Sequence, residues 1–325
     1  MDEPTIADVM AARVRIAPHL APTPAVPCPG LSDVLGARVY LKLESLQPTG
    51  AFKVRGGVNL LACEQAALRA AGTGVACAST GNHGQSVAYA GRLFELAVTV
   101  FAPRDANPLK VAAMRRLGAA VTLTGADFDA SRLACESWAA STGARYIHSM
   151  NEPLLIAGVG TAALEVLWDV PHADWLLVPV GGGTGAAGAC LAAGAVAPGC
   201  RVVGVQAEGA PAVSRSFRER RLLETAAADT MAEGLQTRVA FELPLRIMWE
   251  RLHAVRLVSD ADLWQAMGLL LTHAHLVVEA AGAAPLAAAL RMPELRGTTV
   301  VLILSGGNAT AGQVQRAAAL AAEAP

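Results

Sequence analysis

A lysine directly follows a phenylalanine after a tight turn in the segment "QPTGAFKVRGG", residues 47–57. Pro48 and Gly50 favour a turn, so we expect Lys53 in the first turn of the next helix. A helix N-terminus disfavours a nearby positive charge and lowers the pKa of a lysine. A neutral amine can attack an aldehyde to form a Schiff base, and Phe52 would give a ring a flat apolar neighbour. A surface lysine on an ordinary helix is the alternative that this segment leaves open.

A second polar segment, "STGNHGQ", follows the apolar run "GVACA". Its polar and turn positions are Ser79, Thr80, Gly81, Asn82 and His83. We expect the next helix to begin near Gln85, and free backbone N–H groups at a helix start suit a carboxylate. Asn82 can donate to a phenolic oxygen. His83 can act as a general base, or it can be a loop histidine bonded to the backbone.

A glycine-rich turn follows the apolar run "WLLVPV". Backbone N–H groups in a turn that leads into a helix can hold a phosphate. Gly183, Gly185 and Gly188 also spell G-x-G-x-x-G, and Glu208 follows about twenty residues on, which outlines an NAD-binding fingerprint. A chain with 31 glycines produces such matches easily. Both kinds of site stay open from this motif alone.

A hydroxyl ends the last strongly apolar run, in "VVLILSGGN". Ser305 precedes two glycines that turn the chain. At the carboxyl end of a strand, a hydroxyl can meet a pyridine nitrogen without protonating it. A plain strand-to-helix cap is the alternative.

Short β-branched runs alternate with alanine-rich stretches, which predicts an α/β fold with open twisted sheets. The predicted strands are residues 37–44, 74–79, 97–102, 119–124, 175–180, 201–208 and 298–305. Helices are predicted between most of them, as at Leu109–Leu117 and Asp129–Ser141. The runs are nearly continuous in apolar residues, which indicates parallel strands covered on both faces. Ligands bind at the carboxyl ends of such strands, so two sheets could share one cleft.

The composition excludes several classes of protein. The 325 residues suffice for one large or two modest domains, and 53% of them are hydrophobic. A net charge of −1 points to neither nucleic acid nor an anionic membrane as a partner. No apolar run approaches the ~20 residues of a membrane span, and the N-terminal segment lacks a signal-peptide core, so we expect a cytoplasmic protein. The six cysteines show no C-x-x-C spacing, so buried thiols are expected rather than disulfides or zinc.

Together and in this order, the four motifs resemble those of the serine/threonine dehydratases. These are pyridoxal-phosphate enzymes of the tryptophan synthase β fold, or fold type II. The resemblance covers residues 23–315 and implies two open, twisted, mostly parallel sheets flanked by helices, with pyridoxal 5′-phosphate in the cleft between two domains. The larger domain would comprise residues 1–48 and 150–325. The smaller one, residues 49–149, would carry the segment Ser79–His83, which we call the asparagine loop. A homodimer is expected.

The resemblance also implies roles for individual residues. It assigns cofactor contacts to Phe52, Lys53, Asn82, Gly181, Gly182, Gly183, Thr184, Gly185, Glu279 and Ser305. It assigns substrate contacts to Ser79, Thr80, Gly81, Asn82 and His83. Lys53 would hold the cofactor covalently, Asn82 would donate to its 3-oxygen, and the glycine run would hold its phosphate. Lys53 and Thr80 are the catalytic candidates, on opposite sides of the substrate.

The implied reaction removes water from a 3-hydroxy amino acid such as L-threonine or L-serine and yields a 2-oxo acid and ammonia. Lys53 would remove the Cα proton while the cofactor ring accepts the electrons. The first bond lost from the carbon chain is carbon–oxygen, so we class the enzyme as a carbon–oxygen lyase. A neutral Ser305 beside the ring nitrogen favours elimination, because an acidic partner would protonate that nitrogen and favour transamination.

The chain departs from the family pattern in several places. Relatives usually have glycine where Thr184 stands, and often Ser or Ala where Thr80 stands. Many have "A-D-G" where this chain has "MAEGLQTRVAFELP", residues 231–244, which leaves the substrate open. Ser214 stands where a second carboxylate beside Glu208 would bind a divalent cation in some relatives. We therefore expect no divalent metal site.

Several other functions remain open. An amino-acid racemase would use Lys53 on one face of the substrate and Thr80 on the other. A dehydratase for a special hydroxy amino acid, hydroxyaspartate or a hydroxyectoine-derived one, would share this fold, as would a β-replacement enzyme. A non-catalytic amino-acid sensor would keep Lys53 only to hold the cofactor. An NAD-binding oxidoreductase would use Gly183-Thr184-Gly185, but it would leave the other motifs unexplained.

Overall fold

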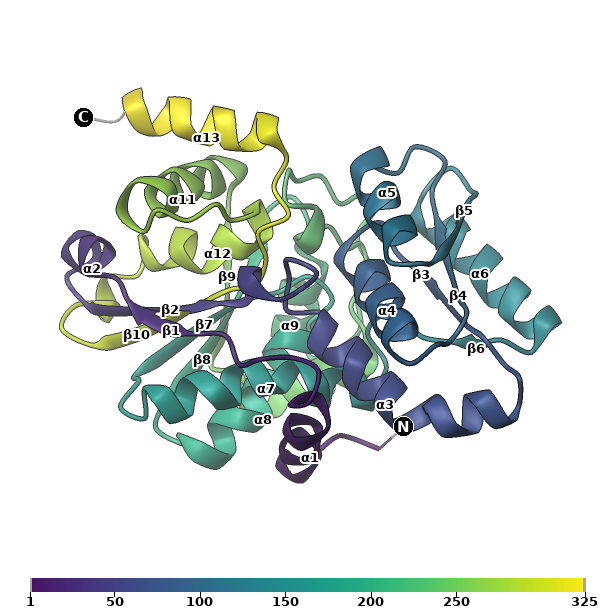
Figure 1. Ribbon diagram of the computed structural model, residues 1–325. Coiled ribbons are helices and arrows are strands. Elements are labelled where there is room, and N and C mark those ends of the chain that lie inside the picture. The colour runs from purple at the N-terminus through teal and green to yellow at the C-terminus, as the bar shows by residue number, and fades with distance from the viewer. Residues whose placement is uncertain (1, 324–325) are drawn as a thin grey trace.

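The computed structural model describes residues 2–323 and has two open, mostly parallel sheets with helices packed against them. Figure 1 shows the larger sheet between two layers of helices, with the smaller sheet and its own helices beside it. The predicted fold class is therefore confirmed. No helix among the described residues is long and apolar enough to cross a membrane.

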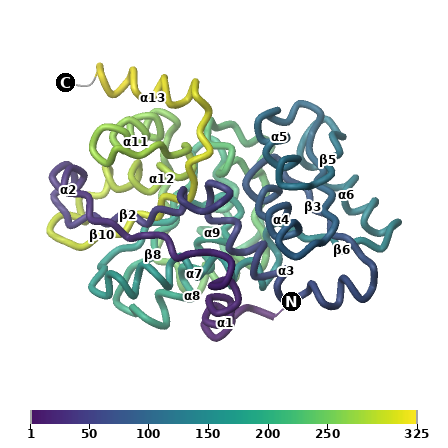
Figure 2. The backbone as a smooth tube through the Cα atoms, in the orientation of Figure 1, coloured from purple at the N-terminus to yellow at the C-terminus, as the bar shows by residue number. Residues whose placement is uncertain are grey.

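The larger sheet joins the two ends of the chain. Its strand order is β1-β2-β10-β7-β8-β9, and β1 is its antiparallel edge strand. The strands are β1 (Ala25–Pro27), β2 (Arg38–Leu43), β7 (Trp175–Pro179), β8 (Arg201–Ala207), β9 (Ala254–Val258) and β10 (Thr299–Leu304). Strand β10 lies parallel between β2 and β7, so the early and late segments share one domain, as Figure 2 traces in purple and yellow.

The smaller sheet has four parallel strands in the order β5-β4-β3-β6. They are β3 (Val75–Ala78), β4 (Val98–Ala102), β5 (Ala120–Leu123) and β6 (Arg145–Tyr146). All four lie within residues 49–149, the range expected for the smaller domain; the domain boundaries themselves stay a prediction.

Helices cover both sheets, and some are buried on every side. Those of the larger domain are α1 (Ile6–Ile16), α2 (Pro29–Leu35), α7 (Pro153–Asp169), α8 (Thr184–Val196), α9 (Ala212–Glu219), α10 (Glu242–Arg251), α11 (Asp260–His273), α12 (Ala280–Ala289) and α13 (Ala311–Glu323). Those between the sheets and around the smaller one are α3 (Val54–Ala70), α4 (Asn82–Leu93), α5 (Pro108–Arg116) and α6 (Phe128–Thr142). Short 3₁₀ turns occur at Glu44–Leu46, Glu233–Leu235 and Pro293–Leu295.

Strand β10 shows why the apolar runs are continuous. Val300 and Leu302 face the core beneath α11 and α12, whereas Val301 and Ile303 face the core that contains α7 and α8. Successive side chains point to opposite faces of a sheet, so a strand covered on both faces must be apolar at every position. This rule identified β2, β3, β4, β7, β8 and β10 from the sequence; β5 was also predicted, although its side chains are mostly exposed.

The strands that sequence inspection missed are short or lie at the edge of a sheet. Strand β6 has two residues and β1 has three. Among residues 2–323, strand β9 pairs with β8 alone, and Arg256 and Leu257 on it are exposed. Edge strands bury less surface, so their sequence pattern is generally weaker, although the edge strand β5 was predicted.

Glycines bring α7 close to its neighbours. A Cβ at Gly158 would lie 2.6 Å from the carbonyl oxygen of Arg55, and one at Gly188 would lie 2.7 Å from the Cα of Gly160. The backbones of α3, α7 and α8 thus meet without intervening side chains. This contact fixes the start of α3, the helix that follows Lys53.

Candidate active site

A cavity of about 700 Å³ is lined by segments that follow strands of both sheets. The predicted residues that line it are Phe52, Lys53, Ser79, Thr80, Gly81, Asn82, His83, Gly181, Gly182, Gly183, Thr184, Gly185, Glu279 and Ser305. The carboxyl ends of parallel strands meet at one edge of each sheet, which brings the separate motifs together. Their individual roles stay predictions.

Lys53 lines this cavity at the residue before α3 rather than in the first turn of that helix. Its Nζ donates to Thr184 Oγ1 at 2.7 Å and lies 5.2 Å from the centre of the Phe52 ring. Burial lowers the pKa of Lys53 from 10.5 to about 8. The pKa therefore shifts in the expected direction, but desolvation of the amine is the cause instead of the helix N-terminus.

Two hydrogen bonds fix the backbone around this lysine. The Phe52 N–H donates to the Ser305 carbonyl at 2.9 Å. The Ser86 hydroxyl, from α4, donates to the Lys53 carbonyl at 2.6 Å. The turn formed by residues 48–53, which we call the lysine turn, is thus attached to the end of β10 on one side and to helix α4 on the other.

The glycine-rich turn has no room for side chains. A Cβ at Gly181 would lie 2.3 Å from the Gly234 carbonyl oxygen, and one at Gly182 would lie 2.2 Å from Met150 Sδ. Gly183 has a φ of 95°, which favours glycine. Helix α8 begins immediately afterwards, so its free N–H groups border the cavity and suit an anion.

The asparagine loop is shaped by Ser79. Its hydroxyl accepts hydrogen bonds from the N–H groups of Gly81 at 3.1 Å and Gly84 at 2.8 Å. These bonds start α4 at Asn82, three residues before the predicted position near Gln85. The N–H groups of Gly81 and Gly84 are therefore already engaged, whereas Ser79 uses its oxygen only as an acceptor and keeps its O–H to donate to an anion.

His83 is a neutral group in the wall of the cavity. Its Nε2 is buried and has no hydrogen-bond partner in the described chain. Burial, together with the neighbouring Lys53 and His148, lowers its pKa to about 3, although a hydrogen bond with the Ile147 backbone acts in the opposite direction. A histidine with this pKa is a weak base and carries no positive charge to attract a carboxylate. This disfavours the general-base alternative.

Asn82 and Glu279 connect the two sides of the cavity. The Asn82 Nδ2 donates to Glu279 Oε1 at 2.8 Å. Burial raises the pKa of Glu279, while Lys110 and the bond from Asn82 act in the opposite direction. Ser305 is also buried at this edge, at the end of β10.

Two ion pairs at the cavity join the domains, and sequence inspection did not find them. Lys110 from α5 pairs with Glu233, and Arg238 pairs with Asp129 from α6. Glu233 and Arg238 belong to the segment 231–244 that departs from the family pattern. That departure was the only available signal, because the partners are distant in sequence.

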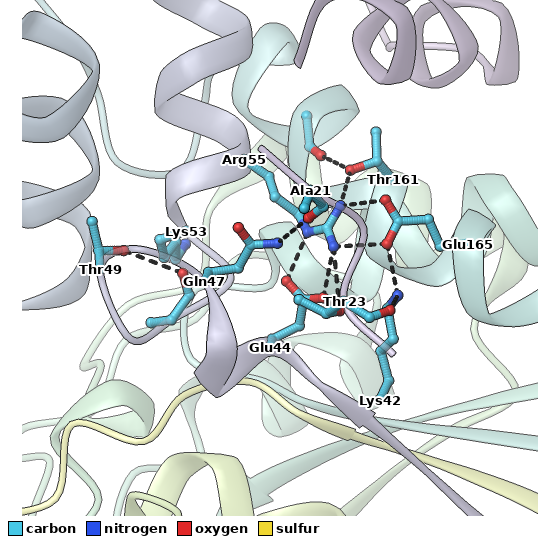
Figure 3. Close-up of polar contacts among 12 residues, drawn as sticks. Ala21, Thr23, Lys42, Glu44, Gln47, Thr49, Lys53, Arg55, Thr161 and Glu165 are labelled. Carbon is cyan, nitrogen blue, oxygen red and sulfur yellow. Dashed lines mark hydrogen bonds and ion pairs between the residues drawn. The ribbon is translucent and has the colours of Figure 1, made fainter. Parts of the chain in front are cut away.

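A buried cluster of charges lies beside the turn that carries Lys53, and it too was missed. Figure 3 shows the Arg55 guanidinium between the carboxylates of Glu44 and Glu165, with Lys42 reaching Glu165. Arg55 donates to both carboxylates at 2.7–2.8 Å, and Lys42 Nζ lies 2.6 Å from Glu165. Burial alone would raise the pKa of Glu165, but Arg55 and Lys42 hold it below its ordinary value.

A family model described as pyridoxal-phosphate dependent enzyme matches residues 16–306. The chain belongs to this family. It is 36% identical over 288 residues to the L-threonine ammonia-lyase of Thermotoga maritima, covering 88% of this chain and 71% of that protein. It is 34% identical over 306 residues to the β-hydroxyaspartate dehydratase of Paracoccus denitrificans, covering 94% of this chain and 96% of that one.

Solved structures agree with this assignment. Maize serine racemase superposes with a TM-score of 0.90 at 28% identity, covering 99% of each chain. The predicted family, fold type and cofactor are thereby confirmed, and the NAD-binding alternative for Gly183-Thr184-Gly185 does not fit this family. The relative's name, ammonia-lyase, refers to the net loss of a carbon–nitrogen bond. Carbon–nitrogen lyase is therefore the appropriate class, in place of the carbon–oxygen lyase expected from the sequence.

The residues of the cavity fit pyridoxal phosphate. The cofactor needs a lysine amine for its aldehyde, anion-binding N–H groups for its phosphate and a partner for its ring nitrogen. The cavity offers Lys53 with a lowered pKa, the glycine turn before α8, and the buried Ser305 hydroxyl. Each of these groups lines the same cavity.

We predict that activity does not require added magnesium or calcium. Glu208 is exposed, and among the described residues it makes no ion pair with the nearby Arg215 or Arg218. The Ser214 N–H donates to Gln206 Oε1 at 2.8 Å, and no carboxylate stands at that position. The single carboxylate of Glu208 is too weak a ligand set to hold a divalent cation. Dialysis against a chelator should leave the turnover rate unchanged; a severalfold loss that magnesium restores would contradict this.

Proposed function

We propose that this enzyme is an ammonia-lyase that converts a small 3-hydroxy amino acid, such as L-threonine, L-serine or 3-hydroxyaspartate, into a 2-oxo acid and ammonia. The observation that carries the proposal is the amine of Lys53, which has a pKa of about 8 in a cavity shared by the glycine turn and the asparagine loop. Relatives named for threonine and for β-hydroxyaspartate support this class of substrate.

Each part of the cavity would hold one part of the cofactor. Lys53 would bind its aldehyde carbon, and the N–H groups at the start of α8 would bind its phosphate. Phe52 would lie against the ring, and Asn82 would donate to the 3-oxygen. When bound, pyridoxal phosphate supplies a conjugated ring that withdraws electrons from the bonds at Cα. Ser305, a neutral hydroxyl, would face the ring nitrogen without protonating it.

The asparagine loop would hold the substrate. The N–H groups of this loop that are not bonded to Ser79, those of Thr80, Asn82 and His83, would bind the substrate carboxylate at the start of α4, together with the Ser79 O–H. The Lys53 amine, once free, would take the proton from Cα. The bond between Cβ and the hydroxyl oxygen would then break, and the hydroxyl would leave as water with the proton that Lys53 took from Cα, which returns Lys53 to a neutral amine. The resulting enamine hydrolyses to the 2-oxo acid and ammonia.

Product analysis of the purified, cofactor-loaded enzyme tests the proposal. L-Threonine, L-serine and the stereoisomers of 3-hydroxyaspartate should be supplied separately, and ammonia and the 2-oxo acid measured together. We expect equal amounts of both products from at least one substrate. If the protein binds the cofactor but turns over none of these amino acids, the proposed lyase activity is contradicted and a non-catalytic amino-acid sensor is favoured.

Racemisation is the second candidate. It requires a proton-transfer group on each face of Cα, and Thr80 lines the same cavity as Lys53. The likeness to maize serine racemase also favours it. Chiral chromatography of the remaining substrate in the same reactions separates the two activities. Interconversion of serine enantiomers faster than ammonia release would replace the lyase with a racemase.

We predict that Ser305→Asp lowers ammonia release by roughly tenfold or more. A carboxylate at this buried position would raise the pKa of the ring nitrogen and keep it protonated, which favours transfer of the amino group over elimination. Ser305→Ala is the matched control, because it removes the hydroxyl without adding charge and should cost less. Unchanged rates in Ser305→Asp would mean that this residue does not contact the ring.

The homodimer and the cytoplasmic location expected from the sequence are also proposals. Light scattering coupled to size-exclusion chromatography tests the first, and a molecular mass near that of a single chain would contradict it. Fractionation of the native cells tests the second.

A further inference from the structure

Three side chains form a hydrogen-bonded chain between the domains. The Asn308 Nδ2 donates to the Thr49 carbonyl at 3.0 Å and to Asn82 Oδ1 at 2.8 Å. The Asn82 Nδ2 then donates to Glu279 Oε1 at 2.8 Å. Asn308 follows the glycines after β10, Thr49 belongs to the lysine turn, and Asn82 begins α4. The chain therefore connects three of the motifs that meet at the cavity.

The Thr49 carbonyl fixes which atoms donate and which accept in this series of hydrogen bonds. A backbone carbonyl can only accept hydrogen bonds, so the NH₂ end of Asn308 must face it. The same NH₂ group reaches Asn82, and it can bond there only to an oxygen. Asn82 must therefore present its oxygen to Asn308 and its NH₂ group to the opposite side. The orientation of both amides follows from the network.

Asn308 packs directly against Gly50, where a side chain would not fit. Gly50 has a φ of 68°, and a Cβ added there would lie 2.5 Å from Asn308 Oδ1. The Gly307 N–H also donates to the Gly50 carbonyl at 2.9 Å, which holds the backbone beside Asn308 against the lysine turn. A reversed Asn308 amide would set its oxygen against the Thr49 carbonyl, where two acceptors would repel each other.

We propose that Asn308 is a positioning residue that keeps an N–H of Asn82 directed at the 3-oxygen of the cofactor. This inference rests on the assignment of Asn82 in the proposed function. The amide nitrogen of Asn82 has two hydrogens; Glu279 accepts one, and the other is free to bond within the cavity. A reversed Asn82 would instead turn its oxygen toward both the Glu279 carboxylate and the electron-rich 3-oxygen.

The proposal predicts weaker cofactor binding when Asn308 loses its donor. Apo-protein of Asn308→Ala should bind pyridoxal phosphate about tenfold more weakly than wild type, which corresponds to one hydrogen bond. The visible absorption band of the bound cofactor should also shift, because its 3-oxygen loses a fixed donor. Asn308→Asp should have the larger effect, because a carboxylate would face two acceptors. Asn107→Ala, at the start of α5 and outside the cavity, is the matched control and should bind normally.

A double-mutant cycle distinguishes positioning from a general structural role. If Asn308 acts through Asn82, then Asn308→Ala should cost little further affinity in an Asn82→Ala background. Additive losses of affinity, or an Asn308→Ala protein with wild-type affinity and absorption, would overturn the proposal. Should Asn308→Ala fail to fold, Asn308→Ser serves in its place, because a serine hydroxyl is too short to keep both bonds. All readouts omit substrate, so failure of the lyase assay would leave this test intact.

Discussion

Replacing Lys53 with alanine is expected to lower ammonia release by roughly 10³-fold or more. The substitution removes both the amine that would hold the cofactor and the base that would take the Cα proton. No other lysine lines the cavity except Lys110 among the described residues, and Lys110 is paired with Glu233. The measurement is the turnover rate with fresh pyridoxal phosphate present, together with the loss of the borohydride-sensitive band near ~410 nm.

Lys53→Arg is the matched control for this prediction. It keeps the positive charge and the length, but a guanidinium does not become a neutral nucleophile at accessible pH. We expect it to be as inactive as Lys53→Ala, and we expect both variants to unfold in urea at concentrations close to that for wild type. Substantial turnover in either variant would show that another group performs the proton transfer.

The parts of the fold that could be predicted follow from rules that use only the residue types of neighbouring positions in the sequence. A strand covered on both faces must be apolar throughout, and this identified strands such as β7 and β10. The rule that ligands bind at the carboxyl ends of parallel strands then placed the asparagine loop and the glycine-rich turn near one cleft. These two predictions needed only local sequence and the topology of a parallel sheet, whereas Lys53 and Ser305 were placed beside the cofactor by the resemblance to the serine/threonine dehydratases.

The parts that could not be predicted depend on partners far apart in the chain. Arg55 lies two residues after Lys53 and looks like a surface charge at a helix start. Its partner Glu165 is 110 residues away, and the pairing exists only because α3 packs against α7. The start of α4 was predicted near Gln85 instead of at Asn82 for a local reason. The hydrogen bonds that the Ser79 hydroxyl accepts at the start of this helix cannot be read from the residue pattern.

Arg55→Met is expected to lower the free energy of unfolding by about 3–5 kcal/mol. The arginine side chain is fully buried, and its loss would leave Glu44 without a cationic partner and Glu165 with Lys42 alone. An uncompensated buried carboxylate is costly, whereas the methionine itself fits an apolar interior. Urea denaturation at neutral pH measures the loss. Arg256→Met, which breaks an exposed pair with Glu294, is the matched control and should cost at most ~1 kcal/mol.

A second substitution decides whether charge is the cause. Glu44→Gln alone should destabilise the protein, because Arg55 donates two hydrogen bonds to that carboxylate. In the Arg55→Met background the same substitution should stabilise it, because it removes a buried charge that has lost its partner. A loss of packing around residue 55 would not reverse the sign of Glu44→Gln. If this substitution destabilises both backgrounds equally, then the cluster contributes through shape and neutral hydrogen bonds, and the pairing of Arg55 with Glu44 has no electrostatic role in stability.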